Sequence, residues 1–144
     1  MILWNYSIDA GYENPKIEST FPPINDNTVP YRTNYININL NQQIKLSQAN
    51  ISIYQEYTDN NHVLRQTVSG QSIYTSLTND YYTVNVQLFD STFNRPGGKY
   101  FIKIDNNFFA DYFTNEPVLG IKEKIWTFNL GMKLWINLNQ FEIL

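Results

Sequence analysis

Residues 35–40 are Tyr35-Ile36-Asn37-Ile38-Asn39-Leu40, a stretch in which every second side chain is aliphatic. Successive side chains of a β-strand point to opposite faces, so this alternation predicts a strand with one apolar face and one polar face. The same period of two recurs in five further windows, and an irregular strand is expected just before residue 22. The seven predicted strands cover residues 16–21, 35–40, 50–54, 62–68, 83–88, 99–104 and 125–130.

The segments between these windows are rich in turn-forming residues. Arg95-Pro96-Gly97-Gly98, for example, places proline and glycine as a type II turn requires, immediately before a predicted strand. The sequence offers no long helical segments for the crossovers that a parallel sheet needs. Seven short strands spread over about 110 residues are typical of an all-β, immunoglobulin-like antiparallel β-sandwich, with a β-barrel as the alternative.

Composition excludes several classes of function. The 144 residues are 42% hydrophobic and 16% charged, which is typical of a folded domain and not of a disordered chain. A net charge of −3 without long basic runs disfavours nucleic acid as a partner. With no cysteine and one histidine, thiol catalysis, disulfides and zinc sites of the cysteine or histidine type are not expected.

Membrane and export signals are also weak in the sequence. No apolar stretch approaches the roughly 20 residues that span a bilayer, so no transmembrane segment is expected. The first residues, Met1-Ile2-Leu3-Trp4-Asn5, become polar too soon for the apolar region of a signal peptide. Residue patterns alone therefore leave the compartment open.

The order of several short motifs resembles one known family. Residues 21–30, with two prolines, a turn and a Val-Pro pair before the strand at 35–40, resemble the opening of the bacterial-type immunoglobulin-like domains first described in S-layer proteins. Asn50-Ile51-Ser52-Ile53-Tyr54 is similar to the third strand of that family. The stretch at 99–105 is similar to its Tyr-x-Ile-x-Ile strand, and Ile125-Trp126-Thr127-Phe128 to its closing strand.

This resemblance runs from about Thr20 to Leu130, and the Asn- and Ile-rich character of the chain is similar to that of repeats in predicted fungal surface proteins. It implies a structural or binding module, often in tandem, of an extracellular or cell-surface protein, and it transfers no catalytic residues. The connection at 105–120 is longer and more aromatic than is usual in the family, and residues 131–144 have no counterpart in it.

A weak internal repeat supports a tandem arrangement. Leu3-Trp4-Asn5-Tyr6-Ser7 matches Ile125-Trp126-Thr127-Phe128-Asn129 in its apolar, Trp, polar, aromatic and polar positions. The offset is about one domain length, so residues 1–14 are interpreted as the last strand of a preceding repeat. Residues 15–130 then form the sandwich, and residues 131–144 form a tail of unclear role.

Candidate chemistry is limited to a few side chains. Asp105, Asp111 and Glu116 lie in the long segment before the last strand, where they are either solvated acids, a hydrolytic pair or calcium ligands, although no Asp-x-Asp-x-Asp spacing supports calcium. His62 has no triad-like neighbours and is expected to face solvent. We therefore assign no catalytic, cofactor or metal site.

The outer face of the predicted sheet contains the one candidate binding patch. If the third, sixth and seventh strands share a sheet, Tyr54, Phe101 and Ile125 point outward together, whereas Trp126 points into the core. Such a cluster is either a recognition patch for a protein or glycan, or a surface covered by other parts of the chain, such as the tail.

The sequence thus predicts a non-enzymatic immunoglobulin-like module that spaces or presents neighbouring domains of a longer surface or secreted protein. The alternative is an accessory carbohydrate-binding module, which needs two or three coplanar aromatic rings on one exposed face. An enzyme is disfavoured, because no nucleophile–base pair and no cofactor motif are present.

Overall fold

The structure is a computed structural model in which residues 10–58 and 60–132 are described. These residues form no helix and eleven strands. The strands are β1 (Ile17–Phe21), β2 (Tyr35–Leu40), β3 (Ile44–Leu46), β4 (Asn50–Thr58), β5 (Asn61–Ser69), β6 (Thr75–Leu77), β7 (Thr83–Gln87), β8 (Lys99–Ile104), β9 (Phe109–Asp111), β10 (Pro117–Val118) and β11 (Ile121–Asn129). The predicted all-β class is confirmed.

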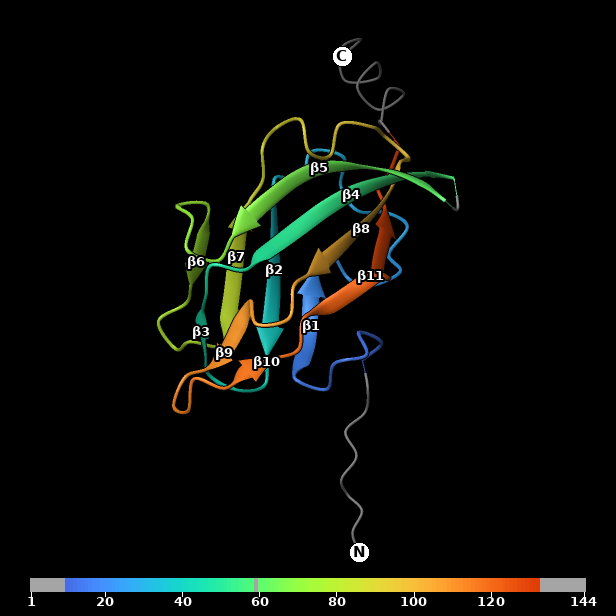
Figure 1. Ribbon diagram of the computed structural model, residues 1–144. Coiled ribbons are helices and arrows are strands. Elements are labelled where there is room, and N and C mark those ends of the chain that lie inside the picture. Colours follow the sequence, from blue (N-terminus) through green and yellow to red (C-terminus); the bar gives the residue numbers. More distant parts are fainter. Residues whose placement is uncertain (1–9, 59, 133–144) are drawn as a thin grey trace, which may run out of the picture.

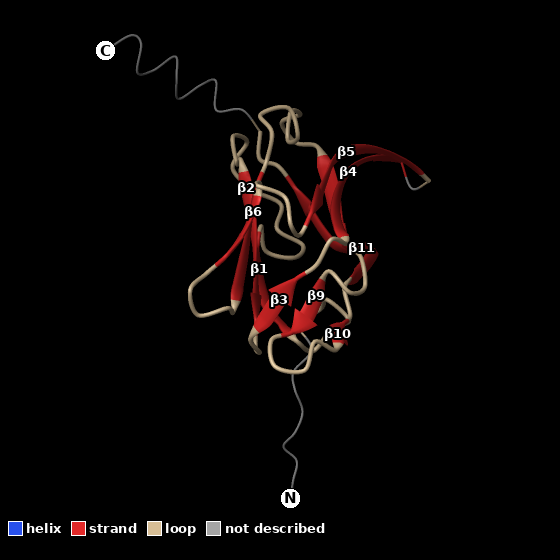
Figure 2. Cartoon of the chain, turned by 60° about the vertical axis from the view of Figure 1, so that its left-hand side comes forward, coloured by secondary structure: helices blue, strands red, loops and turns tan. Residues whose placement is uncertain are grey.

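The strands of the described region are arranged in three antiparallel sheets. Two sheets have four strands each, in the orders β1-β2-β7-β6 and β11-β8-β4-β5, and a small third sheet has the order β10-β9-β3. Figures 1 and 2 show the two larger sheets facing each other, with the small sheet at one end. The facing pair, called the sandwich below, encloses the hydrophobic core.

The long predicted strands occur where the alternation places them. β2 and β8 have the predicted bounds, whereas β4 continues four residues further, to Thr58. The strand count differs from seven because β3, β6, β9 and β10 are also present, each with two or three residues. Strands this short cannot display a period of two, so the sequence pattern does not detect them.

Side chains that the alternation assigns to the inner face are buried in the sandwich. They are Ile36, Ile38, Leu40, Ile51, Ile53, Val84, Val86, Leu88, Tyr100, Ile102, Ile104, Trp126, Phe128 and Leu130. Trp126 has an exposed fraction of 0%, and its indole Nε1–H donates a hydrogen bond to the carbonyl oxygen of Pro22 at 2.8 Å. The predicted core position of Trp126 is confirmed.

The sandwich begins earlier in the chain than residue 15. Tyr12 is buried, and its ring meets the Trp126 ring edge-on at 6.3 Å between centroids. Asn14 is buried as well, and its side-chain amide donates to the carbonyl oxygens of Leu119 and Gly120 at 2.6 and 3.2 Å. These two residues therefore belong to the sandwich. The repeat match at residues 3–7 and all of the predicted 131–144 tail except residues 131 and 132 lie outside the described residues.

The described chain enters and leaves the sandwich at opposite ends (Figures 1 and 2). Residues 10–14 lie at the end with the small sheet, where Asn14 contacts the segment before β11. Residues 130–132 lie at the other end, where Leu130 forms an isolated parallel bridge with Val29 and Gly131 accepts a hydrogen bond from Gly97. We call these the entry end and the exit end.

Candidate functional site

The predicted outer-face patch does not form an exposed cluster. β4, β8 and β11 do share a sheet, with Tyr54 opposite Phe101. Phe101, however, has an exposed fraction of 0%, because the Tyr54 ring stacks on it at 4.9 Å and the His62 ring meets it at 5.4 Å. Ile125 is half-buried and packs against the core. Of the two alternatives for this face, the burial of Phe101 supports the one in which other parts of the chain cover it, here side chains of β4 and β5.

The physical reason lies in the pairing of β5 with β4. This pairing brings His62 opposite Glu56, two residues along β4 from Tyr54, so the His62 ring contacts the rings of both Tyr54 and Phe101. His62 is exposed, as predicted, but it is part of a strand and covers Phe101. This cluster of three rings, in which Tyr54 stacks on Phe101 and His62 meets both edge-on, stabilises the sheet by aromatic contacts of about 0.5–1.5 kcal/mol per pair.

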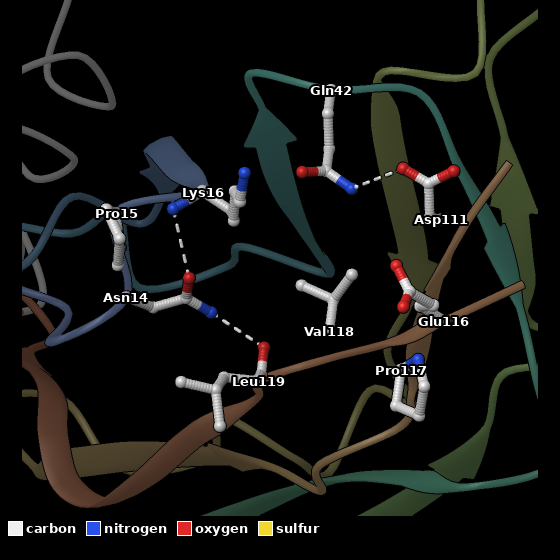
Figure 3. Close-up of a pocket in the computed structure, with 9 residues that line it drawn as sticks. All are labelled: Asn14, Pro15, Lys16, Gln42, Asp111, Glu116, Pro117, Val118 and Leu119. Atoms are coloured by element: carbon white, nitrogen blue, oxygen red, sulfur yellow. Dashed lines mark hydrogen bonds between the residues drawn. The ribbon is translucent and has the colours of Figure 1, made fainter. Parts of the chain in front are cut away.

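A small hollow lies at the entry end, between the start of the described chain and the loop that leads to β10 (Figure 3). It has a volume of about 340 Å³. Its lining residues are Asn14, Pro15, Lys16, Gln42, Asp111, Glu116, Pro117, Val118 and Leu119. Figure 3 shows that Asn14 closes one side by binding Leu119, while Gln42 and Asp111 meet on the other.

Asp111 is held in place by three N–H donors. One oxygen accepts from the backbone N–H groups of Phe113 and Thr114 at 2.8 and 2.9 Å, and the other accepts from the side-chain amide of Gln42 at 3.1 Å. The hydrogen bond from Thr114, followed by that from Phe113, lowers the pKa of the Asp111 carboxyl. A carboxylate stabilised in its charged form is suited to fix the turn at residues 111–115, not to donate a proton.

The lowered pKa predicts how this turn responds to acid. Because the folded pKa lies below the unfolded value, Asp111 stabilises the fold fully above the unfolded pKa, and this contribution is lost as pH falls through the folded pKa. Titration of the Asp111 carboxyl carbon by NMR is expected to give a midpoint below the usual aspartate value of about 3.9. The same titration in concentrated urea serves as control, and equal midpoints in both solutions would contradict the assignment.

The three candidate carboxylates do not converge. Asp111 and Glu116 line the same hollow, but Asp105 accepts a hydrogen bond from the Asn50 backbone and pairs with Lys103 at 3.5 Å. Among residues 10–58 and 60–132, no group of three or more histidine or acidic side chains could hold a metal ion. The hypothesis of a calcium site built from all three carboxylates finds no support in this arrangement.

An aromatic cluster, which sequence reasoning missed, lies beside the 111–115 turn. The rings of Tyr81 and Tyr112 stack at 4.6 Å, and Phe113 meets Tyr112 edge-on at 5.1 Å. The ammonium group of Lys45 lies 5.4 Å from the centroid of the Tyr112 ring. Phe113 itself has an exposed fraction of 75%. The small sheet brings these residues together, and its strands are too short to be detected in the sequence.

A second hollow, of about 450 Å³, lies at the exit end. Its lining residues are Tyr31, Arg32, Thr33, Asn34, Asp90, Phe93 and Asn94. Phe93 is buried, and its ring packs on Tyr100 and Phe128 of the core. Arg32, Asn34 and Asp90 are exposed around it. This hollow therefore combines an aromatic lining with a charged rim.

Comparison with known proteins does not assign a family. No protein-family model matches the chain, and no curated protein matches it significantly. Within the described part of the chain, no helix is long and apolar enough to cross a membrane.

Proposed function

We propose that this chain is an immunoglobulin-like module. The supporting observation is the strand order. Immunoglobulin constant-type sandwiches have sheets A-B-E-D and C-F-G. If β1, β2, β4, β6, β7, β8 and β11 are strands A to G, the two larger sheets become A-B-E-D and G-F-C, with β5 added beside C. Under this assignment, β3, β9 and β10 are insertions in the B–C and F–G connections.

The role that we propose for the module is to space or present neighbouring domains of a longer protein. The observation that carries this proposal is that the chain enters and leaves at opposite ends of the sandwich (Figure 1). Domains joined through such ends extend an array in one direction and do not fold back beside each other. The continuous core between the sheets makes each unit a compact spacer.

The carboxylates support a non-catalytic role. General acid–base catalysis by two carboxyl groups requires environments that raise the pKa of one of them. In the entry-end hollow, Asp111 has a lowered pKa instead, and it accepts two hydrogen bonds from the backbone of the turn that it holds and a third from the side chain of Gln42. We therefore interpret Asp111 as a residue that orders the turn.

The arrangement of exposed rings favours a spacing module over a carbohydrate-binding module. A flat glycan platform presents two or three rings side by side in one plane. Within the partly exposed pairs Phe21–Tyr35 and Tyr81–Tyr112 the two rings stack, and within Tyr74–Phe89 they meet edge-on. In each pair, one ring therefore covers part of the other, so that the pair offers less open ring surface than a platform needs.

The proposed extracellular location follows the family resemblance and is tested directly. Antibodies raised against the full chain are expected to label intact cells of the source organism, or to detect the protein in its medium. Antibody absorbed with purified chain is the control. Labelling only after the cells are made permeable would contradict this location. In parallel, binding of the chain to immobilised glycans would favour the carbohydrate-binding alternative.

A further inference from the structure

Two tyrosine rings, those of Tyr81 and Tyr112, lie stacked on the surface beside the small sheet. Their centroids are 4.6 Å apart, and their planes differ by 28°. Among residues 10–58 and 60–132, no other ring contact joins two tyrosines. Tyr81 is 38% exposed and Tyr112 is half-buried. The pair therefore presents two phenol groups that touch each other and that solvent reaches.

The backbone keeps the two tyrosines side by side. The N–H of Ile44 donates to the carbonyl oxygen of Tyr81 at 3.0 Å, and the N–H of Tyr112 donates to the carbonyl oxygen of Gln43 at 3.1 Å. Tyr81 has a φ of 68°, a left-handed conformation that is unfavourable for a large side chain. Such a conformation persists only where the surrounding contacts hold it, and here the Tyr81 N–H also donates to Thr78 at 2.9 Å. Both side chains therefore start from fixed positions.

Two stacked phenols have the arrangement that oxidative coupling requires. Loss of one electron and the hydroxyl proton turns each phenol into a phenoxyl radical, whose unpaired electron is spread over the π system of the ring. Because this electron density lies above and below the ring plane, a bond between ring carbons next to the hydroxyl-bearing carbons forms face to face. Each bonded carbon then loses its hydrogen as a proton, a proton returns to each phenol oxygen, and both rings regain aromaticity. The product is dityrosine.

We propose that Tyr81 and Tyr112 are a site of oxidative cross-linking, at which hydrogen peroxide and a haem peroxidase convert the stacked pair into dityrosine within one chain. Each molecule of peroxide takes up two electrons and two protons and becomes two molecules of water, which balances the two hydrogen atoms that the tyrosines lose. The bond ties the connection between β6 and β7 to the segment after β9. The chain has no cysteine, so a disulfide cannot supply this brace. The site does not depend on the proposed function.

Ring contact within one chain favours this pair over other tyrosines. Tyr35 and Tyr57 are more exposed than Tyr81, at 46% and 51%. Coupling of those side chains requires an encounter between two chains. Well-oriented groups within one molecule react with effective concentrations of roughly 10⁵–10⁸ M, far above the concentration of any protein solution. In dilute solution, we therefore expect the bond between Tyr81 and Tyr112 to predominate.

Oxidation of the purified full chain with a haem peroxidase and hydrogen peroxide tests the site. In dilute solution, the wild type is expected to give mainly a monomer that has lost the mass of two hydrogen atoms and has dityrosine fluorescence. After digestion with trypsin, peptides 66–99 and 104–122 are expected to appear as one linked species. Tyr112 is the only tyrosine of the second peptide, and fragmentation distinguishes Tyr81 from Tyr74 and Tyr82 in the first.

Two conservative variants separate this pair from its neighbours. Tyr112→Phe keeps the stacked ring but removes the hydroxyl, so the linked monomer is expected to disappear. Tyr82→Phe removes a phenol that is 39% exposed and adjacent to Tyr81, and the yield is expected to stay unchanged. Circular dichroism confirms that each variant is folded. The proposal is overturned if the wild type forms no linked monomer, if Tyr112→Phe forms as much as the wild type, or if fragmentation places the bond at Tyr74 or Tyr82.

Thermal unfolding of the linked monomer measures the effect of the bond. A bond between residues 81 and 112 closes a loop in the unfolded chain and limits its conformational freedom. The linked monomer is therefore expected to melt at a higher temperature than untreated chain. Tyr112→Phe that has been through the same oxidation is the control, and its melting temperature is expected to stay unchanged. A linked monomer that melts no higher than untreated chain would overturn the bracing role.

Discussion

Replacing Trp126 with alanine is expected to lower the free energy of unfolding by about 3–5 kcal/mol. The side chain is completely buried, so the substitution leaves a large cavity beside Tyr12. It also leaves the carbonyl oxygen of Pro22 without the indole donor that now binds it at 2.8 Å. Because domains of this size are stable by about 5–15 kcal/mol, much of the total is lost. Urea unfolding followed by far-UV circular dichroism measures the change.

Two further variants serve as comparisons for Trp126→Ala. Trp126→Phe keeps an aromatic ring but removes the N–H donor, so a smaller loss of about 1–3 kcal/mol is expected. Phe113→Ser changes an exposed side chain and is expected to alter stability by no more than about 0.5 kcal/mol. If Trp126→Ala were as mild as Phe113→Ser, Trp126 would not hold the core together as described.

Gly120→Ala adds a single methyl group, and we expect it to lower the stability of the fold strongly. A Cβ atom at Gly120 would lie 1.9 Å from the carbonyl oxygen of Ile104 and 2.6 Å from that of Asp105. Both neighbours are backbone atoms, which cannot rotate away. The Gly120 N–H also donates to Asn106 at 2.9 Å, and its carbonyl oxygen accepts from Asn14. We expect a loss of about 3 kcal/mol or more, at the upper end for overpacking.

Gly131→Ala is the matched control for that substitution. A Cβ atom there would lie 3.5 Å from its nearest backbone neighbour, the carbonyl oxygen of Val29, which is ordinary contact. Stability is expected to change by no more than about 0.5 kcal/mol. Thermal unfolding of the two variants beside the wild type gives the comparison. Similar melting temperatures for Gly120→Ala and Gly131→Ala would show that the chain before β11 can move aside.

The sequence could predict some residues of the candidate site but not their roles or all of their neighbours. Asp111 and Glu116 could be identified as neighbouring acids, because they lie five residues apart in one segment. Their roles could not, since the hydrogen bond from Gln42 to Asp111 comes from the connection between β2 and β3. The aromatic cluster combines Tyr81 with Tyr112, which are 31 positions apart and meet only through the folded chain.

The pairing of β5 with β4 explains which of the two alternatives for the outer face the structure supports. The alternation in β4 and β8 correctly places Tyr54 and Phe101 on one face, opposite each other. It contains no information about the next strand, and β5 pairs with β4 through two irregularities that position His62. Whether an outward-facing ring is exposed depends on such neighbours. For Phe101, the neighbours cover it completely.

The start of β11 is a second feature that the alternation pattern could not predict. Lys122-Glu123-Lys124 is polar throughout, so the predicted strand begins only at Ile125, whereas β11 begins at Ile121. Lys124 adopts a left-handed backbone conformation, and the pairing with β8 shifts between Ile121 and Trp126. This irregularity interrupts the alternation that the sequence analysis requires.

The sequence by itself determined the all-β class, the positions of the long strands and the inner-face side chains of those strands. These properties depend on the two-residue period of a strand, which is local and needs only the identity of each residue. Tertiary structure alone decided which strands are neighbours, which outward rings are covered and which loops meet at each end. Those properties depend on contacts between residues far apart in the chain, because pairing register and loop closure are set by the packing of the whole domain.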